Sequence, residues 1–458
     1  IWLAPGKLVG KYAIGDVDRT EGLFDLLMPE IKTYGMEEAY DVERELMPIL
    51  LENEQQGMRT PLEKLEKDTS IFQDAVEHVE MWMRKRLHTP GINFNSPMQL
   101  AEALERTGIV TEFERTKKGS VKTSKDALTI DKFHDIEFYR AFAYRNKLTK
   151  AISTFMLPWL TTALATGGII HTDWRQLKRE GAGAITGRLS SSPNFQNIPK
   201  PWEEKDNAYA HPDFIDGLPE LPHLRDYILP DIGQVFGHRD FSQQELRILA
   251  YFEDGPLKEA YVKNPRLDVH LLVKNLLEDY GLIYERGAVK GTNFGILYGM
   301  GVTGISKRLG IPREQAGELI KAWHAVMPGV SGLISDLRQV VQAGDYIYTW
   351  GGRRYGMPPP MFIDGEWKSR EYVLLNYLIQ GSGADATKRA MIAYHKRTEE
   401  ARILCNVHDE INVSCPNKIK VIRNEMRILS DCISSLDFGD VRMLSDSKIG
   451  PCWGSLKS

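Results

Sequence analysis

Two acidic residues, each at the end of a predicted β-strand, are candidate ligands for metal ions. Asp240 ends a predicted strand that starts at Gln234, and it comes directly before Phe241. Asp409 lies between His408 and Glu410, in a turn that joins two runs of alternating apolar residues and so predicts a β-hairpin. Two carboxylates on adjacent strands are typical of sites that hold a pair of metal ions for chemistry on phosphate esters. The carbonyl of Phe241 would add a further oxygen ligand of the kind that Mg2+ prefers.

A third stretch predicts a helix suited to a nucleoside triphosphate. Arg286, Lys290, Phe294 and Tyr298 recur every four residues and therefore share one helix face. The basic pair fits phosphates, and the aromatic pair fits a stacked base. Four glycines run beside this stripe at the same period: Gly287, Gly291, Gly295 and Gly299. Each glycine costs a helix ~1 kcal/mol relative to alanine, so the helix must depend on packing or on a ligand.

These three stretches, in this order, resemble motifs A, B and C of the family A DNA polymerases, the DNA polymerase I family. The resemblance runs from about Tyr40 to the C-terminus. It implies an α+β fold of the right-hand type, with an antiparallel palm sheet and helical fingers and thumb. It also implies a template-directed DNA polymerase that adds deoxynucleotides to a primer 3'-hydroxyl with two Mg2+ ions.

The resemblance assigns roles to individual residues. The catalytic residues would be Asp240, Asp409, Lys290 and, in support, Glu410, with Asp240, Phe241 and Asp409 as metal ligands. The nucleotide contacts would be Gln243, Glu245, His270, Arg286, Lys290, Phe294 and Tyr298. The DNA contacts would be Arg188, Asn376, Gln380, His408, Lys117, Lys118 and Lys122. Arg188 would read the minor groove at the primer terminus, and Glu245 would exclude ribonucleotides.

Two further groups resemble DNA-contacting helices of the family. Arg145, Lys147 and Lys150 resemble a basic helix that follows the primer strand, and Asp385 accompanies Asn376 and Gln380 on a minor-groove helix. Tyr372 departs from the family, which often has an arginine there. Local pattern gives Glu245 a second role, because Ser242-Gln-Gln-Glu245 is a capping box for a helix that starts at Ser242.

The same resemblance divides the chain into six segments. Residues 1–36 would be a remnant of a 3'-5' exonuclease-like domain, since Tyr12 and Asp16 resemble the last of its motifs; without further carboxylates no proofreading is expected. The polymerase domain would start over 37–90, followed by a thumb over 91–165, a first palm part over 166–250, fingers over 251–370 and a second palm part over 371–458.

Composition limits the class of protein. The chain has 458 residues, enough for several subdomains, and a net charge of -4 that hides basic clusters at 115–125 and 175–188. No apolar run reaches the ~20 residues of a membrane span. The four cysteines lack metal-ligand spacing, so we expect them to be reduced. The resemblance implies primer-template DNA and deoxynucleoside triphosphates as partners of a monomer, and an unidentified processivity factor stays an open alternative. We expect the protein in the cytoplasm of a bacterial or virus-infected cell, with an organelle as the open alternative.

Three other functions compete with this interpretation. A single-subunit RNA polymerase is disfavoured by Glu245 and Phe294. A two-metal nuclease would use Asp240 and Asp409 but leaves the stripe from Arg286 to Tyr298 without a purpose. A DNA-binding structural protein would need no metal at all.

Overall fold

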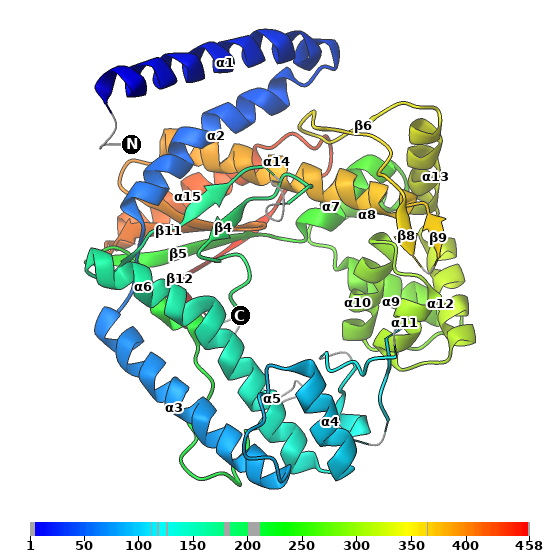
Figure 1. The fold of residues 1–458 in the computed structure, drawn as a ribbon. Helices are drawn as coiled ribbons and strands as arrows, with labels where there is room; N and C mark the ends of the chain where they lie inside the picture. Colours follow the sequence, from blue (N-terminus) through cyan, green and yellow to red (C-terminus); the bar gives the residue numbers. More distant parts are fainter. Residues whose placement is uncertain are drawn as a thin grey trace.

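The centre of the fold is a four-stranded antiparallel sheet in the order β10-β11-β5-β12 (Figure 1). Its strands are β5 Gln234–Phe241, β10 Arg402–Val407, β11 Glu410–Pro416 and β12 Ser445–Gly450. The computed structural model describes residues 5–110, 112–116, 119–124, 127–177, 184–199, 211–363 and 365–456. The predicted motif A strand and motif C hairpin are both confirmed, and His408 and Asp409 form the hairpin turn.

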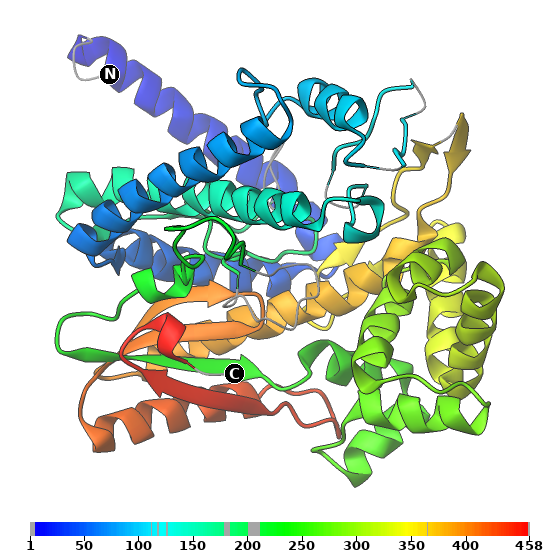
Figure 2. The same ribbon diagram turned by 90° about the horizontal axis from the view of Figure 1, so that it is seen from below.

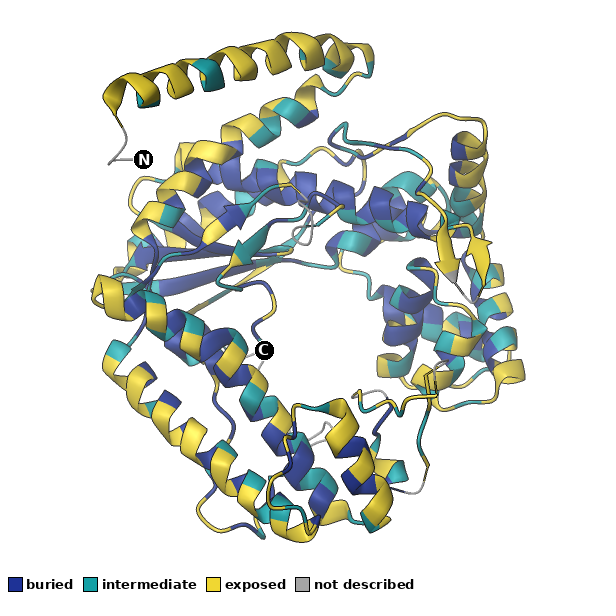
Figure 3. Ribbon diagram, viewed as in Figure 1, coloured by how far each residue is buried: buried dark blue, intermediate teal, exposed yellow. Residues whose placement is uncertain are grey.

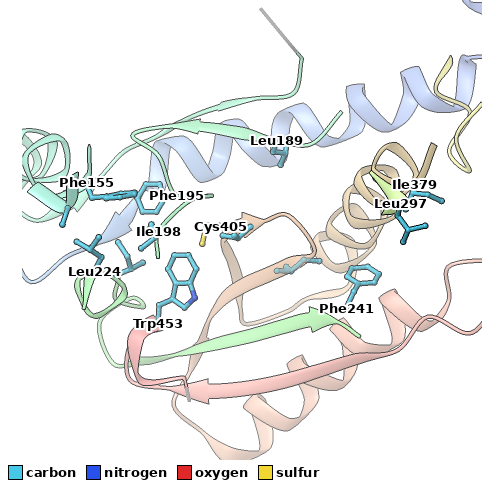
Figure 4. Close-up of a cluster of buried hydrophobic side chains, with 14 of the residues drawn as sticks. Phe155, Leu189, Phe195, Ile198, Leu224, Phe241, Leu297, Ile379, Cys405 and Trp453 are labelled. Carbon is cyan, nitrogen blue, oxygen red and sulfur yellow. The ribbon is translucent and has the colours of Figure 1, made fainter. Parts of the chain in front are cut away.

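Both faces of this sheet are covered. Helix α15 Ile419–Ser434 packs on β5, β11 and β12, and α14 Leu374–Arg397 packs on α15, β10 and β11. On the other face, loop residues gather around Cys405 and Trp453 (Figure 4). The polar residues Asn412 and Ser414, which alternate with the apolar ones on β11, are also fully buried.

The N-terminal half of the chain is mainly helical. Its helices are α1 Gly6–Thr33, α2 Glu37–Gln56, α3 Leu62–Arg86, α4 Pro97–Thr107, α5 Ile136–Ala151 and α6 Leu157–Thr166, with a π-helical turn Ile152–Met156 between the last two. Helix α2 ends before Gly57, whose φ of 63° suits glycine. Ser96 caps α4 by accepting a hydrogen bond from the amide of Gln99.

A second helical region follows the sheet strand β5. It contains α7 Gln244–Glu253, α8 Pro256–Lys263, α9 Val269–Asp279, α10 Arg286–Leu297, α11 Val302–Leu309, α12 Arg313–Val326 and α13 Pro328–Gln342. Figure 2 shows α8–α13 gathered on one side of the molecule and α3–α6 on another, with the sheet beside both. Helices and an antiparallel sheet are thus segregated, which confirms the α+β class.

Small two-stranded sheets and 3-10 turns connect these parts. The sheets are β1 Met58–Arg59 with β2 Ile169–Ile170, β3 Asp173–Arg175 with β4 Ser190–Ser192, β6 Ile347–Tyr348 with β7 Arg354–Tyr355, and β8 Met361–Ile363 with β9 Glu366–Lys368. The 3-10 turns are Ile130–Lys132, Leu224–Tyr227, Glu371–Val373 and Trp453–Ser455. Because β3 pairs with β4 and β6 with β7, these hairpins fix the loops that approach the sheet.

Helix α1 stands apart from the rest of the fold. None of its residues is buried, as its exposed colouring in Figure 3 shows. Tyr12 is 63% exposed, and Asp16 forms an ion pair with Arg19 one turn along the same helix. The exonuclease-like origin predicted for residues 1–36 stays a prediction.

No helix among the described residues is long and apolar enough to cross a membrane. The four cysteines are free thiols, as expected, and Cys405 and Cys415 face the core. Burial raises the pKa of Cys405 to about 12, so this thiol stays protonated at neutral pH.

Candidate active site

The two acids predicted to bind metal lie side by side, Asp240 on β5 and Asp409 in the turn between β10 and β11. In the pairing of β5 with β11, Asp240 is opposite Glu410, and the amide of Phe241 donates to the carbonyl of Asp409 at 3.2 Å. The end of β5 therefore lies directly beside the turn of the motif C hairpin. Residues 169 positions apart in sequence are brought together as the motifs require.

The donor set at this position suits a divalent cation. Burial raises the pKa of Asp409, and the nearby guanidinium of Arg188 offsets this only in part. A buried carboxylate with incomplete charge compensation favours a bound cation. Among the described residues no group of three or more acidic, histidine or cysteine side chains clusters as a metal site. Two carboxylates with one carbonyl match Mg2+, which usually takes few protein carboxylates and completes its shell with phosphates and water.

Glu410 has its own partners and is not free to turn toward Asp240. Its Oε1 accepts a hydrogen bond from Asn412 Nδ2 at 2.8 Å and lies 3.1 Å from His238 Nδ1. Burial alone would raise the pKa of Glu410, but His238 and Asn412 outweigh it and lower that pKa. This arrangement fits the supporting role predicted for Glu410.

The start of helix α7 differs from the prediction. The helix begins at Gln244, its N-cap is Gln243 in a left-handed conformation with φ 57°, and no side chain caps it. The predicted capping box is wrong, because the hydroxyl of Ser242 donates instead to Asp446 on β12. The carboxylate of Glu245 does not cap the helix. It forms an ion pair with Arg188 instead, which places it beside the candidate active site.

Two side chains of motif A join the sheet to α8 and to the segment between α8 and α9. Gln243 donates to the carbonyl of Leu267 at 3.0 Å and accepts from Tyr261 at 2.9 Å. Both ends of this amide are therefore occupied, so the predicted contact of Gln243 with nucleotide would need these bonds to exchange. Arg247 is buried and donates to three backbone carbonyls, including Ser242 at 2.7 Å and Pro265 at 2.6 Å.

The basic and aromatic stripe of motif B is confirmed as one face of α10. Arg286 is half exposed and pairs with Asp268 at 2.6 Å, while Lys290 is exposed. Phe294 and Tyr298 stack, with ring centroids 6.1 Å apart. The Tyr298 hydroxyl is buried and has no hydrogen-bond partner among the described residues. The stripe therefore presents cations at one end and aromatic rings at the other.

His270 lies against this stripe from helix α9. Its ring meets Phe294 edge-on at 5.5 Å, and its Nδ1 accepts from Asn293 Nδ2 at 3.1 Å. Burial, and then the charge of Lys290, lower the pKa of His270 to about 4. The ring is therefore neutral near pH 7 and can accept or donate one hydrogen bond at the stripe.

The glycines beside the stripe serve helix packing at two positions. A Cβ at Gly291 would lie 2.8 Å from Arg308, and one at Gly295 would lie 3.1 Å from Met300. Gly287 is exposed and has open space around it. At Gly299 the φ of 80° and the ring of Tyr372, 2.6 Å from an added Cβ, both require glycine. Tyr372 therefore packs on the end of motif B in this chain.

On helix α14 the predicted DNA contacts divide into two groups. Asn376 and Gln380 are partly exposed one turn apart, and the Asn376 Oδ1 has no partner among the described residues. The DNA contact that the family resemblance implied for Asp385 is wrong. Its side chain is buried and accepts from Thr349 at 2.6 Å and from Arg353 at 2.8 Å.

The basic residues predicted to contact the DNA backbone differ from one another in exposure. Lys122 is exposed and pairs weakly with Glu114 at 3.5 Å, whereas Lys117 and Lys118 lie outside the described residues. Arg145 is not on the surface, so its predicted primer contact is wrong: it is buried and donates to Glu80 and Asn95. Arg188 lies near Glu245, and His408 is exposed at the hairpin turn.

Sequence reasoning missed three residues of this neighbourhood. His238 holds Glu410, Asp446 holds Ser242, and Asp268 holds Arg286. Their partners lie 18 to 204 positions away in sequence. Asp268 alone carried a local signal, because it caps α9 through the amide of Leu271 at 3.1 Å.

Comparison with known proteins gives the class and then the family. The structure matches the POL domain of Pol1 from M. smegmatis, determined as a complex with DNA primer-template and dNTP, with a TM-score of 0.79 and 26% identity over 94% of this chain and 74% of that chain. The fold is that of a right-hand polymerase domain. The sequence model of DNA polymerase family A matches residues 62–455. The chain belongs to DNA polymerase family A.

Curated relatives agree with this membership. The DNA polymerase I of Geobacillus stearothermophilus is 30% identical over 91% of this chain and 46% of its own length. That of Bacillus subtilis is 30% identical over 95% of this chain and 48% of its own length. The chain thus spans about half the length of the curated relatives it matches.

Proposed function

We propose that this chain is a template-directed DNA polymerase that adds deoxynucleotides to a primer 3'-hydroxyl. The observation that carries the proposal is a connection between the two halves of the site. Asp240 and Asp409 lie side by side, and Gln243, three residues after Asp240, bonds to Leu267. The next residue, Asp268, pairs with Arg286 at the start of the α10 stripe. A chain of hydrogen bonds and ion pairs thus connects the acidic pair to the basic end of α10. A metal-bound triphosphate needs acidic groups for its metal ions and basic groups for its phosphates in fixed relative positions.

Two Mg2+ ions are the proposed cofactors, held by Asp240, Asp409 and the carbonyl of Phe241. When bound, they would lower the pKa of the primer 3'-hydroxyl and neutralise the triphosphate and leaving pyrophosphate. The chain's own side chains complete the site. Lys290 and Arg286 would bind the triphosphate, and Lys290 would stabilise charge on the leaving group. Phe294 and Tyr298 would stack on the incoming base pair.

Other side chains would position the sugar and the primer end. Glu245 would fill the space beside the sugar C2', and neutral His270 would contact the nucleotide. Arg188, Asn376, Gln380 and His408 would contact the primer-template duplex near the site. Lys117, Lys118 and Lys122 would contact its phosphates further away.

We assign the subdomains on the same basis. The palm would consist of 166–250 and 371–458, the fingers of 251–370 and the thumb of 91–165, with 37–90 leading into them. The central sheet would be the palm floor, and α10 the nucleotide-binding helix of the fingers. Partners would be primer-template DNA and deoxynucleoside triphosphates, with the protein acting as a monomer in the cytoplasm; the bacterial relatives support that compartment.

One assay separates this proposal from its rivals. Labelled primer-template is incubated with the chain and Mg2+, together with deoxynucleotides, ribonucleotides or no nucleotide. We expect extension with deoxynucleotides only. Extension with ribonucleotides would favour an RNA polymerase, shortening without nucleotide would favour a nuclease, and binding without either would favour a structural protein.

The metal ligands supply the sharpest mutational test. Asp240→Ala and Asp409→Ala should each abolish extension, with rates falling at least ~1,000-fold because the site loses a charged ligand, while primer-template affinity stays near wild type. Glu410→Gln is the matched control and should be much milder, since this carboxylate is engaged by His238 and Asn412. Near-normal primer extension by either alanine variant would contradict the assignment of that aspartate as a catalytic metal ligand.

A further inference from the structure

A buried ionic cluster lies behind the segment that carries Arg188. Its central member is Arg353, in the turn between β6 and β7. Arg353 Nη2 donates to Glu43 Oε1 of α2 at 2.5 Å and to Asp385 Oδ1 of α14 at 2.8 Å. Lys388 of α14 pairs with the same oxygen of Glu43. The cluster has two cations and two anions and joins three elements far apart in sequence.

Such a cluster is expensive to bury and is poor evidence for stability by itself. Burial would lower the pKa of Arg353, but Asp385 and Glu43 outweigh it and raise that pKa, so the guanidinium is charged. Apolar residues of similar volume often stabilise a protein as well as a buried ion pair does. The cluster therefore matters for the geometry that it fixes around Arg353 more than for the stability that it adds.

The guanidinium of Arg353 occupies the space where residue 187 would carry a side chain. A Cβ on Gly187 would lie 2.8 Å from both Cζ and Nε of Arg353, and the φ of Gly187 is 76°. Beside it, the hydroxyl of Tyr355 donates to the carbonyl of Ile185 at 3.1 Å. The β6–β7 turn thus holds the segment from Ile185 to Gly187 at two points.

The far end of this segment is held as well. Gln196 donates to the carbonyl of Asn406, at the end of β10, at 3.2 Å and accepts from Ser191 at 2.6 Å. Arg188 lies between these two attachments, and its guanidinium reaches Glu245 beside the catalytic acids. Displacing one attachment by even a small distance would move the guanidinium of Arg188 relative to Asp409.

We propose that Arg353 is a positioning residue for Arg188: it sets where the Arg188 guanidinium stands and thereby how strictly the enzyme distinguishes a matched from a mismatched primer end. This inference rests on the proposed function and on the role of Arg188 within it. Lysine cannot replace Arg353, because it lacks the planar fork that bonds Glu43 and Asp385 while lying flat against Gly187. Glu43 and Asp385 act one step further out, by orienting the fork.

A double-mutant cycle tests the coupling. The ratio of kcat/KM for matched over mismatched primer ends is measured for wild type, Arg353→Lys, Arg188→Ala and the double variant. Arg353→Lys should lower the ratio at least about threefold in the wild-type background. In the Arg188→Ala background it should leave the ratio unchanged, because the residue through which it acts is gone. The same fall in both backgrounds, or no fall in the first, would overturn the inference.

Controls separate positioning from general damage. Arg402→Lys is matched, since Arg402 forms a similar two-oxygen pair with Asp231 at 2.7 Å but touches no part of 184–199; its ratio should stay at the wild-type value. Thermal unfolding checks that each variant folds. If Arg353→Lys does not fold, Gly187→Ala supplies the second variant, because its Cβ displaces the same guanidinium, and the same coupling to Arg188 is expected.

Failure of the inference can be told apart from failure of the proposed function. Extension of a matched primer by wild type upholds the polymerase assignment whatever the cycle shows. An unchanged ratio in Arg188→Ala itself would contradict the role of Arg188, and the inference would fall with it. A fall in Arg402→Lys equal to that in Arg353→Lys would mean that any partly buried arginine in an ion pair alters discrimination, and it would also overturn the inference.

Discussion

The Glu245 carboxylate has to stay near the acidic pair without repelling it. Burial raises its pKa, the charge of Arg188 lowers it in part, and Asp409 raises it further. Arg188 therefore neutralises a partly buried acid beside Asp409. This ion pair accounts for one arginine placed near two carboxylates. Under the proposed function, we expect loss of Glu245 to affect substrate choice more than folding.

We expect Glu245→Ala to incorporate ribonucleotides more readily, by about tenfold or more, because truncation opens the space beside the sugar C2'. The helix should not lose a cap, since Gln243 and not a side chain of the predicted box begins α7. Single-nucleotide incorporation with matched ribo- and deoxynucleotides measures the effect. Ser242→Ala is the control and should leave sugar selection unchanged. Equal selectivity in wild type and Glu245→Ala would place this residue away from the sugar.

Single residues show where sequence reasoning succeeded and where it failed. Asp240 and Asp409 were predictable because a strand end and a tight turn are local patterns. Arg145 and Asp385 were not, because their burial depends on Glu80, Asn95 and Arg353, which lie far away in the chain. A charged residue on a helix looks alike in sequence whether it meets solvent, DNA or a buried partner.

At the scale of elements, helices α9 and α10 meet through a histidine that is costly to protonate. The pKa of His270 is about 4 in the folded protein, against an ordinary value of 6.5. The unfolded chain therefore binds more protons between these values. The contribution of neutral His270 to stability is fully present above pH 6.5 and is lost as the pH falls toward 4.

The free energy of unfolding should therefore fall more steeply with acid in wild type than in His270→Gln. The extra slope in the window from pH 6.5 to 4 is at most about 1.4 kcal/mol per pH unit, the value for one proton. Urea unfolding at several pH values gives the slopes. His78→Gln, on the exposed face of α3, serves as the control. Parallel curves for wild type and His270→Gln would show that the ring is not protected from protonation.

The glycines of α10 allow a matched comparison within one helix. Gly287→Ala should raise the free energy of unfolding by up to about 1 kcal/mol, since it gains helix propensity in open space. Gly295→Ala gains the same propensity but must move Met300 and Ile305, at 3.1 and 3.4 Å from the new Cβ, so its gain should be smaller or reversed. Chemical denaturation compares the two. Equal effects of the two substitutions would mean that Met300 and Ile305 of the neighbouring segment move aside at no cost in stability.

Elements were more predictable than their ends and contacts. The strand from Gln234, the motif C hairpin and the α10 stripe followed from hydrophobic period and residue type. The start of α7 did not, because β12 places Asp446 beside Ser242 and removes the hydroxyl that would have capped the helix. A local signal fails where a distant strand offers the same group a better partner.

For the whole molecule, the net charge of -4 does not show that basic residues lie in ion pairs with neighbouring acids. Lys122 and Lys132 share Glu114, at 3.5 and 3.2 Å, and these lysines lower the pKa of that carboxyl, Lys132 most. Lys307 of α11 contributes as well, so this loop lies near the second helical region. Acids beside basic residues keep the free protein close to neutral, and under the proposed function Glu114 would have to release these lysines for DNA phosphates to bind them.

DNA affinity should therefore respond to both members of the pair in opposite directions. Lys122→Gln should weaken primer-template binding and reduce the slope of log affinity against log salt by about 0.9, the value for one phosphate contact. Glu114→Gln should tighten binding at low salt, because it releases Lys122 and Lys132 toward phosphate. Lys396→Gln is the control, since this lysine near the end of α14 pairs with Glu45 on the exposed side of α2. Fluorescence anisotropy from 50 to 200 mM salt measures the slopes. If Lys122→Gln and Glu114→Gln both behave like the control, the loop does not meet DNA, and the thumb contacts proposed for it would have to lie elsewhere.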